Sequence, residues 1–569
     1  MSENQAQTPG DAWLSFTRSR FNADSPNGVA HRDLSDKLDS EFTAMERAMV
    51  EARRLRNRTR PACYAPPEVL SLLFEEVKAI WDPYVPDLGE PLRYESGWIT
   101  LTHVCSLWRK VALDTPALWA RHSNCFDLSP QYIPDILFRS RMVPLDIELD
   151  WERAGGNEID KILPIWLSSP VVQRIRRLTL THFEREEFDT ACSLLPSTLT
   201  NLRELHVWSS LSGGDSGRQL PAALYELPNV THLTLVDCYI PWEAPIFSHN
   251  LTHLHLLSTP ASTAPFYRVA RDLFSRMTSL QTLELNTEVP SPDLTTPSSI
   301  RQREINFPES LRELDLYIKS PGMEDGTTFL LASRIPAACR QNIVLYSGRR
   351  RNSAWNGPSG IAPHLLEQHF LALSAETSKS LLLDTTATTS GPIEASIHKY
   401  NKQHAPALDR LCIMHSDVRR RLVMSNINFC EHLPHFPLDR LHVIALAPPA
   451  VQHFHNTRSW SQLLPASNVC DVSIPDALCS EALQSLAEPH SSTDDKPPSL
   501  VFPRMGVLRL YLRGDREMEY MAVVIALVTL INKRMESGTP LRELVVPKQS
   551  SDWAVWGTVR PNVTVRFEL

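Results

Sequence analysis

"VTHLTLVDC", residues 230–238, contains the pattern that decides the fold expected for this chain. The pattern begins with an apolar residue, continues with two variable residues, and ends with an apolar, a variable and an apolar residue. Side chains alternate between the two faces of a strand, so Leu233 and Leu235 would face a core, with His232 and Thr234 on the solvent side. Such a strand cannot bury its apolar face alone, and it therefore predicts similar neighbours.

The same spacing recurs along most of the chain, which makes chance an unsatisfactory explanation. The further copies are "IRRLTL" (Ile175), "LRELHV" (Leu202), "LTHLHL" (Leu251), "LQTLEL" (Leu280), "LRELDL" (Leu311), "LDRLCI" (Leu408), "LDRLHV" (Leu438), "VCDVSI" (Val469), "LRELVV" (Leu541) and, more loosely, "MGVLRL" (Met505). Successive copies are mostly 21 to 31 residues apart. The long gap before Leu408 predicts two weaker copies, at "NIVLYS" near Ile343 and "SKSLLLD" near Leu381.

This pattern resembles the leucine-rich repeat, L-x-x-L-x-L-x-x-N/C-x-L, with Cys238 at the Asn/Cys position. Most copies lack that Asn or Cys, and their spacing is irregular. The resemblance implies an α/β fold in which residues 140–569 form an irregular solenoid with a parallel concave sheet. Pro/Ser/Thr-rich stretches at 288–304 and 488–499 are expected to be loops or unstructured insertions.

The N-terminal region divides into two parts. Residues 1–32 are polar and contain Pro and Gly, so we expect them to be unstructured. Residues 33–60 predict an amphipathic helix, because apolar residues recur at helical spacing; the apolar set is Leu38, Phe42, Met45, Met49, Ala52 and Leu55. This helix would either pack on its own chain or pair in a dimeric coiled coil, and its few heptads favour the first.

Residues 62–122 predict a small helical unit with more apolar surface than it can hide. "APPEVLSLLFEEV" places two prolines at the start of one helix, and "LTHVCSLWRKVALDTPALWA", residues 101–120, predicts two more. Thr115 is expected to cap the last of these, with Pro116 in its first turn. A unit of this size needs cover for its excess apolar face, from the repeats, from a partner, or from both on different faces.

These segments resemble the F-box, closest to the fungal F-box-like type. The matching residues are Pro66, Pro67, Glu68, Val69, Leu70, Val104, Cys105, Trp108, Arg109, Val111, Ala112, Thr115, Pro116, Leu118 and Trp119. The chain departs from the family by a long spacer, residues 81–97, between the first two helices. The match covers about a tenth of the chain, and an N-terminal helix and C-terminal leucine-rich repeats also look like this family.

The resemblance implies a non-catalytic substrate receptor of an SCF-type cullin–RING ubiquitin ligase. The F-box would dock on the small adaptor subunit, which joins it to the cullin, and the repeats would hold a target protein for ubiquitin conjugation. The expected adaptor-contacting residues are Pro66, Pro67, Leu70, Phe74, Leu101, Val104, Cys105, Trp108 and Trp119.

We expect the target to contact the outward third and fifth positions of the pattern. In the first half these are Glu204, His206, His232, Thr234, His253, His255, Thr282, Glu284, Glu313 and Asp315, and in the second half Arg410, Cys412, Arg440, His442 and Arg509. The first half thus looks acidic and histidine-rich and the second basic, although a solvated face with random charge explains the pattern almost as well. The nearby imidazoles of His232, His253 and His255 suggest zinc less strongly than a polar contact surface.

Two other functions remain open from the residues: a leucine-rich-repeat scaffold in a non-ligase complex, and, more distantly, a hydrolase using Ser216 of "GGDSGR". No cofactor or metal motif is evident. The net charge of −8 argues against nucleic-acid binding, and the longest apolar run, residues 521–531, is too short to span a membrane. Scattered cysteines without an evident signal peptide predict a reduced protein of the cytoplasm or nucleus.

Overall fold

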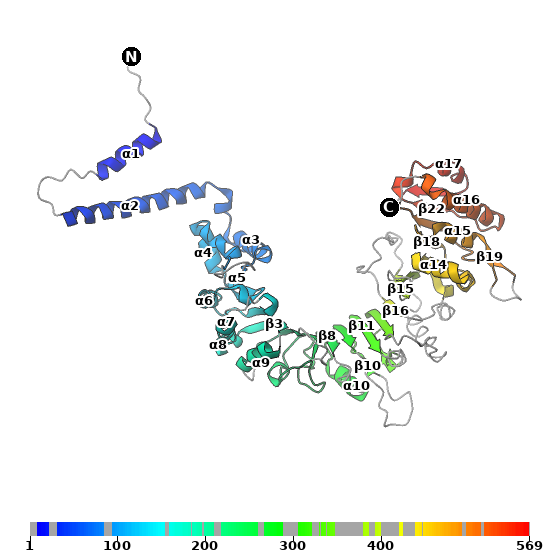
Figure 1. Cartoon of the computed structure of the whole chain (residues 1–569), viewed down its shortest axis with the longest axis horizontal. Helices are drawn as coiled ribbons and strands as arrows, with labels where there is room; N and C mark the ends of the chain where they lie inside the picture. The colour runs from blue at the N-terminus through cyan, green and yellow to red at the C-terminus, as the bar shows by residue number, and fades with distance from the viewer. Residues whose placement is uncertain are drawn as a thin grey trace, which may run out of the picture. The chain divides into compact units, whose positions relative to one another are not determined.

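The computed structural model (Figure 1) divides into two compact units, residues 1–175 and 176–569. It describes residues 8–21, 31–84, 94–153, 159–183, 185–195, 199–209, 218–259, 267–287, 305–320, 329–330, 332–336, 338–347, 379–385, 393–399, 420–424, 438–446, 448–491, 497–513 and 517–567. Within those residues, no helix combines the length and hydropathy that crossing a bilayer requires.

The first unit is mainly helical. Its helices are α1 (Pro9–Arg20), α2 (His31–Arg58), α3 (Pro67–Ile80), α4 (Ser106–Asp114), α5 (Pro116–Ala120), α6 (Ile133–Arg139), α7 (Ile159–Trp166) and α8 (Ser169–Val172). Short 3₁₀ helices are η1 (Pro61–Cys63), η2 (Gly97–His103), η3 (Cys125–Asp127) and η4 (Trp151–Arg153). Two strands, β1 (Arg121–His122) and β2 (Leu145–Asp150), pair in parallel.

The N-terminal segment differs from expectation in two respects. The region predicted to be unstructured contains α1, because Thr8 and Asp11 form a reciprocal capping box that satisfies backbone N–H groups at the start of this helix. Arg20, in its last turn, forms a bidentate ion pair with Glu41 of α2, at 2.6 and 2.9 Å. The helix predicted over 33–60 is present as α2, but none of residues 33–58 is buried, and of its apolar stripe Phe42 contacts the Phe21 ring at the end of α1 at 4.8 Å between centroids.

Two tryptophans occupy the centre of the first unit. Trp98 and Trp119 are fully buried, their ring centroids lie 5.0 Å apart, and Trp119 Nε1 donates to the Ala112 carbonyl oxygen at 2.7 Å. The spacer that precedes Trp98 turns back at Gly97, whose φ is +51°. A Cβ there would lie 2.5 Å from the backbone of Asp82, so this position requires glycine.

The segment around Thr115 differs in detail from the sequence prediction. Leu101 and Val104 do not belong to one helix with Trp108, because η2 ends before α4 begins, and Cys105 Sγ accepts from Trp108 N at the start of α4. Pro116 does open α5. Thr115 does not cap it through its side chain, because the hydroxyl donates instead to the Val111 carbonyl oxygen at 2.7 Å.

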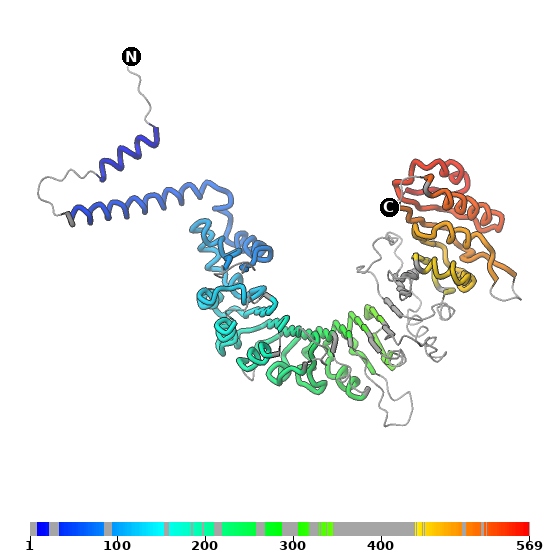
Figure 2. Tube along the Cα trace, viewed as in Figure 1, coloured from blue at the N-terminus to red at the C-terminus, as the bar shows by residue number. Residues whose placement is uncertain are grey.

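The second unit contains a large parallel sheet. Its first part comprises β3 (Ile175–Phe183), β4 (Glu204–Ser209), β6 (His232–Val236), β8 (His253–Thr259), β9 (Thr282–Thr287), β11 (Glu313–Ser320) and β13 (Arg340–Ser347), each pairing with the next. Figure 2 shows this order as a steady change of colour along neighbouring strands. From β4 to β11, each strand begins at the third residue of the predicted pattern, and the apolar residue two positions earlier is buried.

A second run of parallel strands lies in the C-terminal part. It comprises β17 (Leu441–Leu446), β18 (Asp471–Pro475), β21 (Val507–Tyr511), β22 (Glu543–Val546) and β23 (Thr564–Phe567). Among the described residues of the unit, the connecting helices are α9 (Arg185–Leu194), α10 (Tyr267–Arg276), α14 (Pro448–Thr457), α15 (Cys479–Ala487), α16 (Met521–Glu536) and α17 (Val555–Val559). The apolar run at 521–531 is therefore part of a helix, one side of which packs in the core.

Short elements complete the second unit. The short 3₁₀ helices are η5 (Ala222–Leu224), η10 (Leu438–Arg440), η11 (Trp460–Leu463), η12 (Glu517–Tyr520) and η13 (Lys548–Ser550). Three pairs of two-residue strands are β5 (Arg218–Gln219) with β7 (Cys238–Tyr239), β10 (Ile305–Asn306) with β12 (Ser333–Arg334), and β19 (Pro489–His490) with β20 (Ser499–Leu500). Within the stretch 488–499 predicted to be a loop, β19 lies at the start, and its antiparallel partner β20 begins at the last residue. The insertion at 288–304 lies outside the described residues.

The two runs are joined by strands whose spatial order is not their chain order. These are β14 (Lys379–Thr385), β15 (Ile393–Lys399) and β16 (Arg420–Met424), placed as β13–β16–β15–β14–β17. The weak copies predicted near Ile343 and Leu381 coincide with β13 and β14, but these strands are not neighbours, and β15 is antiparallel to both strands beside it. The copy at Leu408 lies outside the described residues. The chain is a mixed α/β protein with a large, mainly parallel sheet.

Candidate protein-binding surfaces

Helix α3 carries two apolar faces rather than one. Leu70 and Phe74 point into the first unit, each 1% exposed, and the Phe74 ring lies 5.2 Å from that of Trp108. A second set of apolar side chains on α3 is exposed, and it lies about 100° around the helix axis from Leu70 and Phe74. Counted from its first member, the other members lie three, four and eleven residues further along the chain. This outer row of α3 consists of Val69, Leu72, Leu73 and Ile80.

The outer row is well exposed to solvent. Leu73 is 51% exposed and Ile80 is 86% exposed, although both belong to a regular helix beside a packed core. Val104, at the end of η2, and Trp81, directly after α3, are further exposed apolar residues, and η2 packs against α3. The first unit therefore presents an apolar helix face that nothing in its described residues covers.

The nine expected adaptor-contacting residues fall into three groups. Pro66, Pro67 and Val104 are exposed, and Cys105 and Trp108 are partly exposed. Leu70, Phe74, Leu101 and Trp119 are buried core residues, so they cannot form a contact surface without unfolding the unit. The sequence prediction merged two faces of α3 into one; the period of 3.6 residues separates them, and it could have identified Leu73 and Ile80.

Lys78 and His122 are titratable groups in the interior of the first unit. Lys78 Nζ lies 5.2 Å from the Trp98 ring centroid and donates to the carbonyl oxygens of Leu118, at 2.6 Å, and Arg121. Burial lowers the pKa of Lys78 to about 8. His122 Nε2 lies 2.9 Å from the Trp119 carbonyl oxygen, and burial lowers the pKa of this imidazole to about 3. Both groups satisfy backbone carbonyls and have a structural role.

In the second unit, parallel register aligns the predicted target-binding residues in two rows. The strands β4, β6, β8, β9 and β11 pair so that each third position faces the next third position, and each fifth the next fifth. The first row is Glu204, His232, His253, Thr282 and Glu313, and the second row is His206, Thr234, His255, Glu284 and Asp315. The structure therefore brings together the residues predicted for the first half.

Two histidines of the first row stack. The ring centroids of His232 and His253 lie 4.1 Å apart with 10° between the ring planes. The Nδ1 atoms lie 2.9 Å from the hydroxyl oxygens of Thr231 and Thr252, and each of these hydroxyls donates its own hydrogen to a backbone carbonyl. Each threonine oxygen therefore accepts a hydrogen bond from Nδ1–H, which sets the tautomer of both imidazoles. Burial lowers the pKa of His232 and of His253, so the stack is neutral near pH 7.

Carboxylates in these rows have different partners. Burial alone would raise the pKa of Glu204, but the hydrogen bond and charge of Arg177 outweigh this effect and lower it. His255 Nδ1 lies 2.9 Å from Glu284 Oε2, a pairing that the sequence prediction missed although both residues occupy fifth positions. Burial raises the pKa of Asp315, and the charge of Glu284 adds to this. Among the described residues, the imidazoles and carboxylates of these rows do not form a group of three ligand atoms within 4.8 Å.

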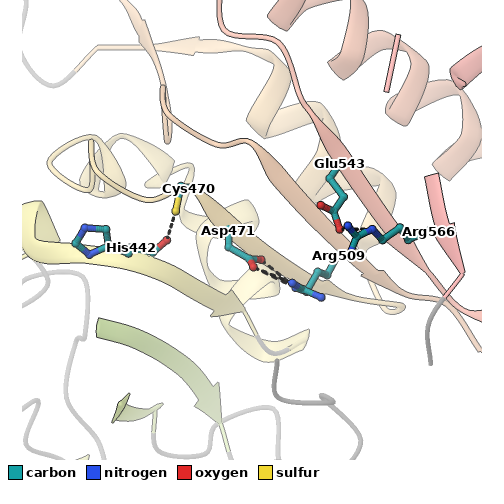
Figure 3. Close-up of polar contacts among 6 residues, drawn as sticks. All are labelled: His442, Cys470, Asp471, Arg509, Glu543 and Arg566. Atoms are coloured by element: carbon teal, nitrogen blue, oxygen red, sulfur yellow. Dashed lines mark hydrogen bonds and ion pairs between the residues drawn. The ribbon is translucent and has the colours of Figure 1, made fainter. Parts of the chain in front are cut away.

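Of the residues predicted for a basic second half, Arg509 has its charge balanced by a carboxylate of the neighbouring strand. Arg509 Nε and Nη2 donate to the Asp471 carboxylate at 3.0 to 3.2 Å, and Arg566 pairs with Glu543 at 3.2 Å (Figure 3). Asp471 and Glu543 occupy third positions of their own copies, "VCDVSI" and "LRELVV", so the arginine charges are neutralised by neighbouring strands.

The remaining predicted residues of this half are only partly placed. His442 is exposed on β17, and its carbonyl oxygen accepts from Cys470 Sγ at 3.3 Å. Arg440 belongs to η10, but its side chain lies outside the described part of the chain. Arg410 and Cys412 lie outside the described residues, as does Ser216 of the hydrolase alternative.

No family model matches this chain, and no curated protein is found to be similar to it. Its function must therefore be inferred from the chemistry of the two surfaces: the outer row of α3 in the first unit, and the two polar rows of strands β4 to β11 in the second. The first surface is apolar and helical. The second combines stacked neutral imidazoles with carboxylates.

Proposed function

We propose that this protein is a substrate-receptor subunit of an SCF-type cullin–RING ubiquitin ligase in the cytoplasm or nucleus. The first unit, an F-box, docks on the small adaptor subunit that connects it to the cullin. The second unit, an irregular leucine-rich-repeat solenoid, binds a target protein with the polar rows of its sheet. The chain brings the target to the ligase and performs no chemistry itself.

The outer row of α3 is the observation that carries this proposal. Leu73 and Ile80 keep apolar side chains in water, whereas Leu70 and Phe74 of the same helix are buried. Burying a leucine or isoleucine side chain stabilises an association by roughly 1.5–3 kcal/mol. A partner groove that received the four residues of the row would therefore gain several kcal/mol. Docking an amphipathic helix in an apolar groove is a common mode of protein recognition.

Co-purification of the full chain with adaptor and cullin tests the docking surface. We expect Leu73→Asp and Ile80→Asp each to weaken adaptor capture by about 30-fold or more, since roughly 2 kcal/mol of burial is lost and a carboxylate is desolvated. Both side chains are exposed, so the variants should fold normally. Phe138→Asp is the matched control, because Phe138 of α6 is 84% exposed, as Ile80 is at 86%, but lies off the row.

The outcomes separate the proposal from its alternative. Wild-type capture by both α3 variants would refute docking through this row. A chain that captures the adaptor but never the cullin would instead support a leucine-rich-repeat scaffold in a non-ligase complex. Leu70→Asp is unsuitable as a test, because Leu70 is a core residue and its replacement by a carboxylate would unfold the unit.

Affinity capture under proteasome inhibition tests the target surface. We expect Glu284→Lys with Asp315→Lys to lose the captured target while the adaptor is retained, because these neighbouring carboxylates lie in the second row. Glu226→Lys with Asp272→Lys changes the net charge equally at exposed positions away from these strands, and it should leave capture unchanged. Equal capture by both double variants would move the target-binding site away from the polar rows.

A further inference from the structure

Helix α2 is long, and most of its surface is exposed to solvent. It comprises 28 residues, about 42 Å at 1.5 Å per residue, and none of residues 33–58 is buried. Helices in proteins obtain most of their stability from packing of an apolar face. The contacts of α1 with α2 involve Glu41 and Phe42, and they leave Met49 and Leu55 about half exposed. The C-terminal half of the helix in particular has a face with no cover.

This face has the spacing of a coiled-coil seam. Leu38, Phe42, Met45, Met49 and Ala52 follow one another at intervals of four, three, four and three residues. Such an alternation keeps apolar residues along one line when two helices wind around each other. The seam is short, so apolar contact alone does not define the direction of a partner helix.

The charges of α2 define that direction. Residues 31–44 contain four acidic residues, Asp33, Asp36, Asp39 and Glu41, and two basic ones, Arg32 and Lys37, which gives a net charge of −2. Residues 45–58 contain five basic residues, Arg47, Arg53, Arg54, Arg56 and Arg58, and two acidic ones, Glu46 and Glu51, which gives a net charge of +3. Two ion pairs within the unit involve these charges, Glu41 with Arg20 and Arg54 with Glu51. This distribution of charges interacts favourably with the dipole of the helix itself. It also makes a second α2 attractive when it runs in the opposite direction and repulsive when it runs in the same direction.

We propose that α2 pairs with α2 of a second copy of this chain in antiparallel orientation. A two-fold axis across the seam places the acidic half of each helix beside the basic half of the other, and it supplies each apolar row with an identical row. One surface thereby provides both the apolar and the charge complementarity. The proposal is independent of the ligase function, because α2 precedes the outer row of α3 and shares no residue with it.

The molar mass of the full chain in solution tests the pairing. We expect about twice 64.4 kDa by sedimentation or light scattering at micromolar concentration. Met45→Asp with Met49→Asp should yield monomers, because two carboxylates enter the seam. Ser40→Asp with Ala44→Asp adds the same charge at exposed positions off the row and should remain dimeric. A monomeric wild type, or a Met45→Asp/Met49→Asp variant that stays dimeric, would overturn the proposal.

Charge reversal tests the orientation. Arg53→Glu with Arg56→Glu should weaken an antiparallel dimer by about tenfold or more, and adding Asp36→Lys with Asp39→Lys should restore it. Both changes oppose the helix dipole, so recovery in the fourfold variant cannot come from a more stable helix. In a parallel dimer, the first pair of substitutions would instead relieve repulsion between the basic halves. A dimer strengthened by Arg53→Glu and Arg56→Glu would therefore refute the antiparallel arrangement.

Adaptor capture provides the control that separates this proposal from the proposed function. The monomeric Met45→Asp/Met49→Asp variant should capture adaptor as the wild type does, since the outer row of α3 is intact. The Leu73→Asp variant should remain dimeric while losing adaptor. Dissociation of the Leu73→Asp dimer would show that α3 rather than α2 forms the contact between copies, and it would overturn the proposal.

Discussion

Acidification should destabilise the first unit through a single histidine, His122. Its side chain is buried at 7% exposure, its ring centroid lies 5.6 Å from that of Trp166, and its Nε2 lies 2.9 Å from the Trp119 carbonyl oxygen. A carbonyl can only accept, so Nε2 carries the hydrogen of the neutral imidazole. Burial is the main cause that lowers the pKa of His122 to about 3, the charge of Lys78 adds to it, and the bond to Trp119 opposes it.

The sign and size of the effect follow from proton linkage. The unfolded chain binds a proton at His122 with the ordinary imidazole pKa of 6.5, whereas burial lowers the pKa of this side chain in the folded chain to about 3. The free energy of unfolding is therefore highest above pH 6.5 and falls as the pH decreases toward 3. The pKa difference of about 3.5 between the unfolded and folded chain, at 1.36 kcal/mol per pKa unit, sets an upper limit of roughly 5 kcal/mol on the loss of unfolding free energy. The slope from this one proton reaches about 1.4 kcal/mol per pH unit.

Urea unfolding of the full chain, followed by tryptophan fluorescence at a series of pH values, measures this slope. His122→Gln retains an N–H that can donate to Trp119, but it does not titrate. We expect the wild type to lose more unfolding free energy than this variant between pH 6 and 4. His103→Gln, at an exposed position of η2, is the matched control and should behave as the wild type. Parallel pH curves for wild type and His122→Gln would refute the reasoning.

Three further predictions concern other parts of the chain. Arg509→Met should lower the free energy of unfolding by about 3–5 kcal/mol in urea titrations, because the Asp471 carboxylate, which is 4% exposed, loses its ion pair. The double variant that also carries Asp471→Leu should recover most of this loss. Gly97→Ala should lower the melting temperature of the first unit, since φ is +51° and the Cβ would meet the Asp82 backbone, whereas Gly557→Ala, with open space around it, should not. His232 and His253 should both titrate below pH 6.5 in NMR spectra of the imidazole protons, because burial lowers the pKa of each; a midpoint above 6.5 for either would contradict this.

The positions of the strands were predictable because they depend on local pattern. In the copies from β4 to β11, the first apolar residue is buried and the strand begins two residues later, as the alternation of side chains requires. The parallel register then follows, since shifting one strand by a residue would turn its leucines to solvent. The polar rows of β4 to β11 could be read from the sequence for the same reason. The start of α5 at Pro116 is another local feature that was predicted.

Other features depend on contacts between residues far apart in the chain. The order β13–β16–β15–β14–β17 is set by competition among strands of similar pattern, which a local spacing cannot decide. The same limit explains why the Asp471–Arg509 and His255–Glu284 pairs were missed: each joins residues on neighbouring strands, at 38 and 29 positions of separation.

The same limit of prediction from local sequence applies within one helix, α3, which has a buried inner face and an exposed outer face. The prolines and leucines of α3 are enough to predict a helix that is apolar over most of its circumference. Which leucines are core and which are surface depends on the packed fold, because Trp98, Trp108 and Trp119 cover one side of the helix and not the other. Burial depends on what lies opposite a side chain, and for Leu70 and Leu73 the residues that decide it lie more than twenty positions away along the chain.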